Sequence, residues 1–178
     1  RQRFCDFEIL SFDNASADGT RAILDDYPEV RRFDVPEGAY VPGRVLNRAV
    51  AESRGQWVVF NNADAVPLDD VWLEALVRPL AEGRAGAVYA RQVCRPDADP
   101  WVQMDYARAF GDVAFGDSFF SMASSAATKA VLEKYPFDPD ITYSEDVYWA
   151  KGLRAAGVAV AYAPDARAEH SHNYDPAQ

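Results

Sequence analysis

The stretch from Trp57 to Asp70 reads WVVFNNADAVPLDD and carries the clearest structural signal in the chain. It opens with apolar, β-rich residues that are typical of a short buried strand. The strand runs out into Asn61, Asn62 and Asp64, and a proline then stops it. Two amides and a carboxylate at one strand end offer hard oxygen ligands suited to Mg²⁺ or Mn²⁺. An ordinary polar loop is the alternative interpretation.

Strand and helix patterns alternate on both sides of this stretch, which predicts an α/β fold with a mostly parallel sheet flanked by helices. Ligands of such sheets bind beyond the carboxyl ends of the strands, and both DNASADGT (13–20) and NNADAVP (61–67) fall there. The second half is less regular, and residues 118–137 are interpreted as a small-residue stretch entering a helix. Strands are expected at 7–12, 30–35, 56–60, 85–93 and 158–164, and helices at 20–27, 45–55, 69–83 and 144–157.

The composition excludes several classes of protein. The 178 residues are 49% hydrophobic and 13% aromatic, which is enough for one domain with a buried core. A formal net charge of −10 argues against nucleic-acid binding, and it means that a phosphate-bearing ligand needs a cation or placed arginines.

The cellular location is also constrained by the sequence. Cys5 and Cys94 show no CxxC spacing and are expected to be free thiols in a reducing compartment. The apolar runs are too short to form a transmembrane segment. We therefore expect a cytoplasmic protein, or one that is peripheral at the inner face of the membrane.

Two pairs of acidic or amide residues carry side chains capable of chemistry, and each pair has a structural alternative. Asp13 and Asn14 can hydrogen-bond the edge of a nucleobase, or they can form an Asx-rich turn. Glu145 and Asp146 open a predicted helix, where the helix dipole favours anions and one carboxylate can act as a general base. Simple charge placement at the helix start is the alternative.

Two further pairs, each with at least one basic residue, complete the candidates. Arg44 and Asn47 lie three residues apart and hence on one helix face, where Arg44 can meet a phosphate or form a surface ion pair. His170 and His172 are the two histidines of the chain. At this spacing on an extended chain their side chains point in opposite directions, so we expect one of them to face a given site.

The order and spacing of these clusters resemble the family-2 glycosyltransferases of the GT-A fold, from about residue 7 to residue 174. DNASADGT is similar to the DDGSTDGT-like turn of that family, and GRVLNRAVAESRG (43–55) is similar to the helix that follows it. Asn62-Ala63-Asp64 is similar to the metal-binding DxD motif, with an amide in place of the first carboxylate.

The resemblance implies an inverting, metal-dependent enzyme that acts on sugar nucleotides and has a Rossmann-like GT-A sheet. It assigns Mg²⁺ or Mn²⁺ to Asp64 and His170, and the role of general base to Asp146 with Glu145 beside it. The side chains that it assigns to nucleotide binding are Asp13, Asn14, Arg44, Asn47 and Asn62.

The resemblance also implies a single domain over 1–178, with a nucleotide-binding half (1–95) and an acceptor and catalytic half (96–178). The partners would be a nucleotide-diphosphate sugar donor and a glycan or lipid-linked acceptor. Aromatic residues of the second half, Trp101, Tyr106 and Phe110, are expected either to wall the acceptor pocket or to pack in the core. NNADAVP and HSHNY (170–174) resemble rhamnosyltransferase-type members that build bacterial surface polysaccharides.

Two departures from the family pattern bear on activity. Family members begin with another strand and helix, so the fold is expected to be N-terminally incomplete, with an exposed sheet edge. Asn62 removes one negative charge from the metal site. Both departures favour an alternative hypothesis, a degenerate GT-A domain that binds a sugar nucleotide or glycan without turnover. A nucleotidyltransferase is the third hypothesis, and it would need a Gly-rich, basic phosphate loop that these residues do not contain.

Overall fold

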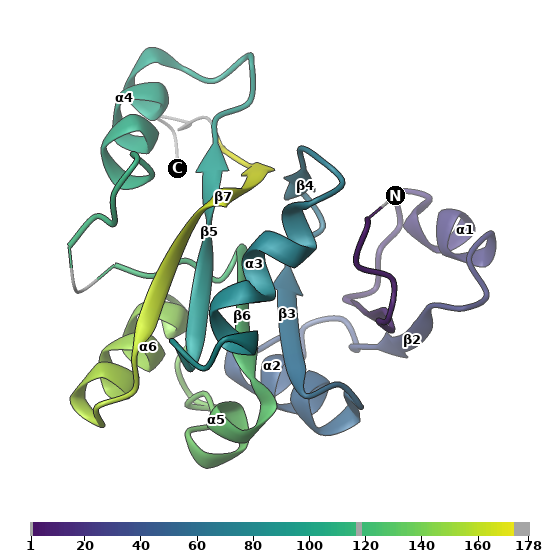
Figure 1. Cartoon of the computed structure of the whole chain (residues 1–178). Coiled ribbons are helices and arrows are strands. Elements are labelled where there is room, and N and C mark those ends of the chain that lie inside the picture. Colours follow the sequence, from purple (N-terminus) through teal and green to yellow (C-terminus); the bar gives the residue numbers. More distant parts are fainter. Residues whose placement is uncertain (1, 117–118, 173–178) are drawn as a thin grey trace.

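The computed structural model describes residues 2–116 and 119–172 and confirms the α/β class (Figure 1). Within these ranges, no helix is long and apolar enough to cross a bilayer. In chain order the elements are β1 (Leu10–Asp13), α1 (Thr20–Asp25), β2 (Arg31–Asp34), α2 (Pro42–Glu52), β3 (Trp57–Asn61), β4 (Val66–Pro67), α3 (Trp72–Ala81), β5 (Ala87–Val93), α4 (Pro100–Ala109), β6 (Ser124–Thr128), α5 (Lys129–Lys134), α6 (Glu145–Ala155) and β7 (Val160–Glu169).

Five strands form one sheet in the order β3-β6-β5-β7-β4. β5 and β7 pair in parallel, whereas β6 runs antiparallel to both β3 and β5, and β4 runs antiparallel to β7. The expectation of mostly parallel pairing is therefore wrong, and the sheet is mixed. β3, β5 and β7 nevertheless share one direction, so their carboxyl ends meet the start of β6 at a single edge of the sheet.

The reversed strand β6 explains this difference. Its sequence, SSAAT, lacks the bulky β-branched and aromatic residues that mark most strands, and sequence analysis therefore takes it as the approach to a helix. Its first four residues are buried. Ala127 packs into the hydrophobic cluster on one face of the sheet, and Ala126 packs into the cluster on the other. Small side chains suit this position because bulky residues of both clusters close over the strand.

The sheet separates two hydrophobic cores. Successive residues of β5 alternate between them, with Ala87 and Tyr89 in the first cluster and Val88 and Ala90 in the second. α3, which lies across the near face of the sheet in Figure 1, covers the second cluster, and α5 and α6 contribute to the first. Helices on both faces thus fix the strands whose ends carry the polar motifs.

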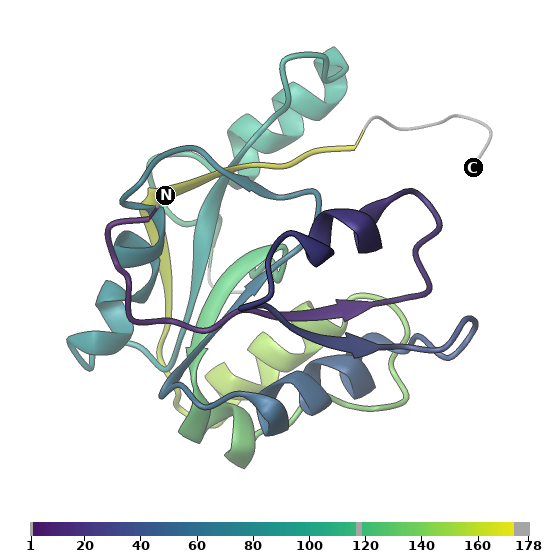
Figure 2. The ribbon, with the colours of Figure 1, turned by 90° about the vertical axis from the view of Figure 1, so that its right-hand side faces the viewer.

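β1 and β2 form a separate parallel pair connected through α1 (Figure 2). α1 has no buried residue, and every residue of β1 is partly exposed. Phe12 and Phe33 stack with their ring centroids 4.7 Å apart. The Arg48 guanidinium of α2 lies 5.7 Å and 5.4 Å from these two centroids. This unit is therefore attached to α2 by side-chain contacts, and no described strand pairs it with the larger sheet.

The first turn of α2 packs directly on backbone of the segment before α6, which gives a test of this junction. A Cβ atom on Gly43 would overlap the carbonyl oxygen of Asp138. We expect Gly43→Ala to lower the free energy of unfolding by about 1–3 kcal/mol, because one of two backbone segments must move. Urea denaturation followed by circular dichroism measures this change.

Gly152→Ala in α6 is the matched control. A Cβ at Gly152 meets no atom within 4 Å. This substitution should raise the free energy of unfolding by about 0.5–1 kcal/mol, because alanine is the better helix former. Equal stabilities of the two variants would contradict the packing described for α2.

Candidate active site

The end of β3 forms a tight turn that displays Asp64. The Ala65 amide donates to the carbonyl oxygen of Asn62 at 3.0 Å, and the Asn61 side-chain amide donates to the Ala65 carbonyl at 2.7 Å. The Asn62 amide in turn donates to the Ala123 carbonyl at 2.9 Å, which ties the turn to the residue before β6. These hydrogen bonds hold the backbone of the turn in place, and the Asp64 carboxylate remains exposed.

His170 lies just beyond the end of β7 and is fixed by neighbours on β5. Its backbone amide donates to the Val93 carbonyl at 2.9 Å, and its imidazole Nδ1 lies 2.8 Å from Oε1 of Gln92. The Gln92 amide nitrogen donates to Ser121 Oγ at 2.6 Å, which leaves Oε1 as the acceptor for the imidazole N–H. The opposite nitrogen, Nε2, is buried and has no hydrogen-bond partner among the described residues.

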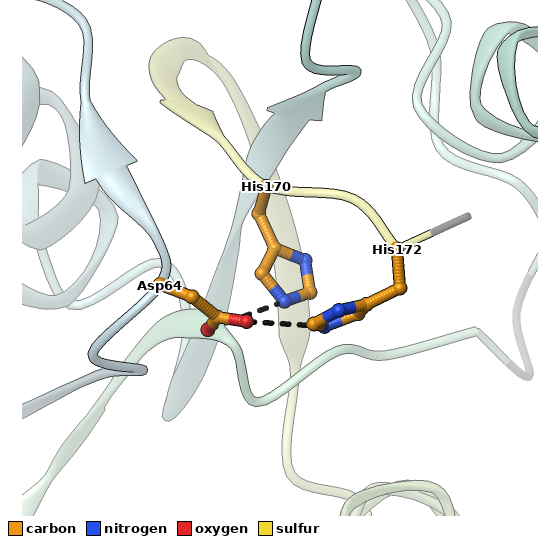
Figure 3. Close-up of side chains that lie close together, drawn as sticks. All are labelled: Asp64, His170 and His172. Atoms are coloured by element: carbon orange, nitrogen blue, oxygen red, sulfur yellow. Dashed lines mark ion pairs between the residues drawn. The ribbon is translucent and has the colours of Figure 1, made fainter. Parts of the chain in front are cut away.

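Asp64, His170 and His172 come together at this edge of the sheet (Figure 3). His170 Nε2 lies 3.6 Å from Asp64 Oδ1, and His172 Nε2 lies 3.1 Å from Asp64 Oδ2. The expectation that one of the two histidines faces a given site is wrong. Side chains alternate along a strand, but β7 ends at Glu169, so the alternation does not extend to His172. Residues 173 and 174 of the HSHNY motif lie outside the described residues.

The protonation state of His170 suits metal binding. Burial lowers the pKa of its imidazole, and the nearby Asp64 carboxylate offsets only part of that effect. A neutral imidazole with its N–H on Gln92 presents the Nε2 lone pair toward Asp64 and His172. These three side chains therefore supply two nitrogens and one carboxylate oxygen that can hold a divalent cation.

Asp146 lies in the first turn of α6 and is held by two backbone amides. Its Oδ1 accepts from the Val147 amide at 2.8 Å, and its Oδ2 accepts from the Met122 amide at 3.0 Å. Ser144, which caps the helix, has a φ of 57°, a left-handed conformation that is uncommon outside glycine. Asp146 and His170 line the same cavity, whose volume is about 320 Å³.

Two further expected residues flank this cavity. Tyr106 of α4 and Phe110, which directly follows that helix, line it, and Phe110 is buried, so these two aromatics combine packing with a position on the cavity wall. Trp101 is 71% exposed on the same helix and does not line the cavity. Glu145 is partly buried, and burial raises the pKa of its carboxyl, with a smaller contribution in the same direction from Asp146.

Asp13 and Asn14 lie on the separate β1–β2 unit. Asp13 accepts a hydrogen bond from the Ser16 amide at 3.2 Å and pairs with the Arg21 guanidinium at 2.8 Å. The Ser16 side chain, then the Ser16 amide and the contact with Arg21, lower the pKa of the Asp13 carboxyl. Asn14 is exposed. Among the described contacts, none connects either residue with Asp64 or Asp146, so their nucleotide-binding role stays a prediction.

Arg44 and Asn47 contact the segment that precedes α6. Arg44 donates to the Pro139 carbonyl at 2.9 Å and forms an exposed ion pair with Asp140, also at 2.9 Å. The Asn47 side chain donates to the Phe137 carbonyl at 2.8 Å and accepts from the Phe137 amide at 3.0 Å. Both residues thus position the chain that leads to Asp146, and binding of a nucleotide by them stays a prediction.

Sequence reasoning missed three contributors to the site. His172 is the first, because the alternation of an extended chain does not hold beyond Glu169. The others are Gln92 and the Met122 amide, and Gln92 is a polar residue within a largely apolar strand pattern, AGAVYARQV. A buried polar side chain needs hydrogen-bond partners, and this signal could have marked Gln92 as a residue that positions another group.

Comparison with known proteins connects the site to a family. The model of the family described as glycosyl transferase family 2 matches residues 1–138. The O-antigen chain rhamnosyltransferase RfbN of Salmonella typhimurium is 26% identical over an alignment of 183 positions. The alignment covers 95% of this chain and 58% of that protein. The chain therefore spans less than two thirds of the length of this curated relative.

Solved structures show the same fold. The mannosyltransferase PcManGT from Pyrobaculum calidifontis, in complex with GDP-Man and Mn²⁺, matches with a TM-score of 0.66 and 24% identity, over 92% of this chain and 47% of that chain. S. aureus TarS, in complex with UDP-GlcNAc, matches with a TM-score of 0.72 and 16% identity, over 98% of this chain and 52% of that chain. The GT-A fold expected from the sequence is confirmed.

The contacts of Asn47 generate a prediction about stability. Asn47→Ala leaves the amide and carbonyl of the buried residue Phe137 without their side-chain partners. We expect the free energy of unfolding to fall by about 1–3 kcal/mol, the cost of unsatisfied buried polar groups. Chemical denaturation checks this value.

Asn14→Ala is the control, since it removes the same amide from an exposed position. Its effect should stay within about 0.5 kcal/mol, as for most surface substitutions. If Asn47→Ala were as stable as the native protein, its hydrogen bonds to Phe137 would not contribute as described.

Proposed function

Because this chain belongs to glycosyl transferase family 2, we propose that it moves a sugar from a nucleotide-diphosphate sugar to an acceptor hydroxyl with inversion at the anomeric carbon. One observation carries the proposal: Asp146 and His170 line one cavity, and His170 lies 3.6 Å from Asp64. A candidate base and a candidate metal site are thus within reach of a single sugar nucleotide.

The donor side of the reaction is assigned to Asp64 and His170. In this proposal they hold Mg²⁺ or Mn²⁺, which neutralises charge on the departing diphosphate. The assignment also accounts for the charge of the protein. A chain with a formal net charge of −10 can accept an anionic donor where a cation intervenes. Asp13, Asn14, Arg44, Asn47 and Asn62 are retained as proposed nucleotide contacts in the 1–95 half.

The acceptor side is assigned to Asp146 in the 96–178 half. An ionised carboxylate has about four acceptor positions, and the Val147 and Met122 amides use two of them. The amides fix the orientation of the carboxylate and leave acceptor positions for a hydroxyl proton. Glu145, beside it, is proposed to assist through its charge.

The proposed step is a single displacement. The acceptor hydroxyl oxygen forms a bond to the anomeric carbon from the face opposite the leaving group, while its proton passes to Asp146. The bond between the anomeric carbon and the phosphate oxygen breaks, and the nucleoside diphosphate leaves with the electron pair. One displacement inverts the configuration and requires no covalent intermediate with the protein.

The biological setting is proposed from the curated relative. RfbN is an O-antigen chain rhamnosyltransferase. We infer that this chain acts in the synthesis of a bacterial surface polysaccharide, on a glycan or lipid-linked acceptor, with rhamnose as the first sugar to test. Asn62, where the DxD motif has a carboxylate, favours one alternative, a domain that binds sugar nucleotides without transfer.

Asp146→Asn in the full-length protein tests the role of the base. We expect turnover to fall by roughly 10²–10⁴-fold, the usual contribution of general-base catalysis, with donor affinity nearly unchanged. Steady-state kinetics measures turnover, and titration calorimetry with the nucleotide sugar measures affinity.

Asp112→Asn is the control, because Asp112 is an exposed carboxylate paired with Arg91 and should leave turnover unchanged. A parallel loss of donor affinity in Asp146→Asn would make Asp146 a binding or structural residue. Tight donor binding by the native protein without any transfer would support the alternative instead.

A further inference from the structure

His172 adds a third possible ligand to the candidate metal site. Its Nε2 lies 3.1 Å from Asp64 Oδ2, and the rings of His172 and His170 are nearly perpendicular, with centroids 5.0 Å apart. One ligand atom from each of Asp64, His170 and His172 lies within 4.8 Å of the others (Figure 3). This spacing allows a single ion to contact all three side chains.

The contact between His170 and Asp64 points to a cation at this position. The Gln92 carbonyl oxygen takes the imidazole N–H on the far side of the ring, so Nε2 carries a lone pair. That lone pair faces a carboxylate oxygen at 3.6 Å, and two acceptors face one another. The side chain of His170 is 10% exposed and that of Asp64 is 48% exposed, so an ion can reach the pair from the Asp64 side. A metal ion would satisfy both of them.

The chemistry of the donors favours certain metals. Two imidazole nitrogens and one carboxylate suit Mn²⁺, Co²⁺ and Zn²⁺, whereas Mg²⁺ prefers oxygen ligands in a strict octahedron. Asn62 reduces the number of carboxylates in the motif to one, Asp64. The site therefore has a single negative charge and little to offer Mg²⁺.

We propose that Asp64, His170 and His172 form a three-ligand site that binds transition-metal ions without nucleotide and discriminates against Mg²⁺. Zn²⁺ and Co²⁺ bind more tightly than Mn²⁺, and Mn²⁺ binds more tightly than Mg²⁺, which is the order expected for nitrogen-containing sites. Three protein ligands leave open positions for oxygens of a donor diphosphate. The inference deepens the metal site of the proposed function and names the class of ion that the site takes.

The test is calorimetric titration of the metal-stripped, tag-free full-length protein with Zn²⁺, Co²⁺, Mn²⁺ or Mg²⁺ in the absence of nucleotide. We expect one site per chain and the order given above. The visible absorption of bound Co²⁺ provides a second readout of nitrogen coordination. Comparable affinities for Mg²⁺ and Zn²⁺, or no binding of any of the four ions, would overturn the proposal.

Three variants identify the ligands. His172→Ala should weaken Zn²⁺ and Mn²⁺ binding by about tenfold or more, since even indirect partners of metal ligands contribute that much. Asn62→Asp should strengthen Mg²⁺ binding, because it adds a carboxylate two residues from Asp64. Asp165→Asn is the control and should bind metal as the native protein does. It removes an exposed carboxylate of β7 that pairs with Arg78 of α3.

The outcomes separate this proposal from the transferase assignment. Native-like binding by His172→Ala would show that His172 is not a ligand, and the contact with Asp64 would then be a simple ion pair. Metal binding in the expected order with no sugar transfer would leave the site intact and refute the transferase. Sugar transfer with equal support from Mg²⁺ and Mn²⁺, together with unselective metal binding, would overturn this proposal and leave the transferase assignment intact.

Discussion

The site depends on the antiparallel insertion of β6 between β3 and β5, because the residues just before β6 hold each part of it. Of residues 121–123, the first accepts a hydrogen bond from Gln92, which orients His170. The second donates its amide to Asp146, and the third accepts from the amide of Asn62 at the turn that displays Asp64. One short segment therefore sets the position of the candidate base relative to the candidate metal ligands.

This arrangement also shows which parts of the molecule could be predicted from its sequence. Strands with bulky apolar side chains, such as β3 and β5, can be recognised in the sequence, because these side chains fill the cores on both faces of the sheet. The polar turn after β3 lies at the predicted edge of the sheet, since strand direction alone fixes that edge, whereas the DNASADGT turn lies on the separate β1–β2 unit. β6 could not be predicted, because its serines and alanines have little strand propensity. Their small size fits the narrow space between the two cores.

The site residues divide in the same way. Asp64, Asp146 and His170 could be selected as candidates by motif and spacing, since each is an ionisable group at a strand or helix end. Contacts that are distant in sequence could not be foreseen. The Asn47 side chain hydrogen-bonds to the backbone of Phe137, 90 positions further along the chain. Its amide can pair with a peptide group as well as with the edge of a nucleobase. The sequence pattern cannot distinguish between two partners that present the same donors and acceptors.

The attachment of the β1–β2 unit has a consequence for the motions of the protein. The unit contributes no strand to the larger sheet among the described residues, and its helix buries no residue. Its contacts with α2 include the Arg48 guanidinium on two phenylalanine rings and the hydrogen bond that Arg31 donates to the Glu52 carbonyl at 2.9 Å. Regions with so little buried surface open with a smaller free energy than the rest of a domain. Backbone amides of this unit should therefore exchange with solvent deuterium well before those of β5.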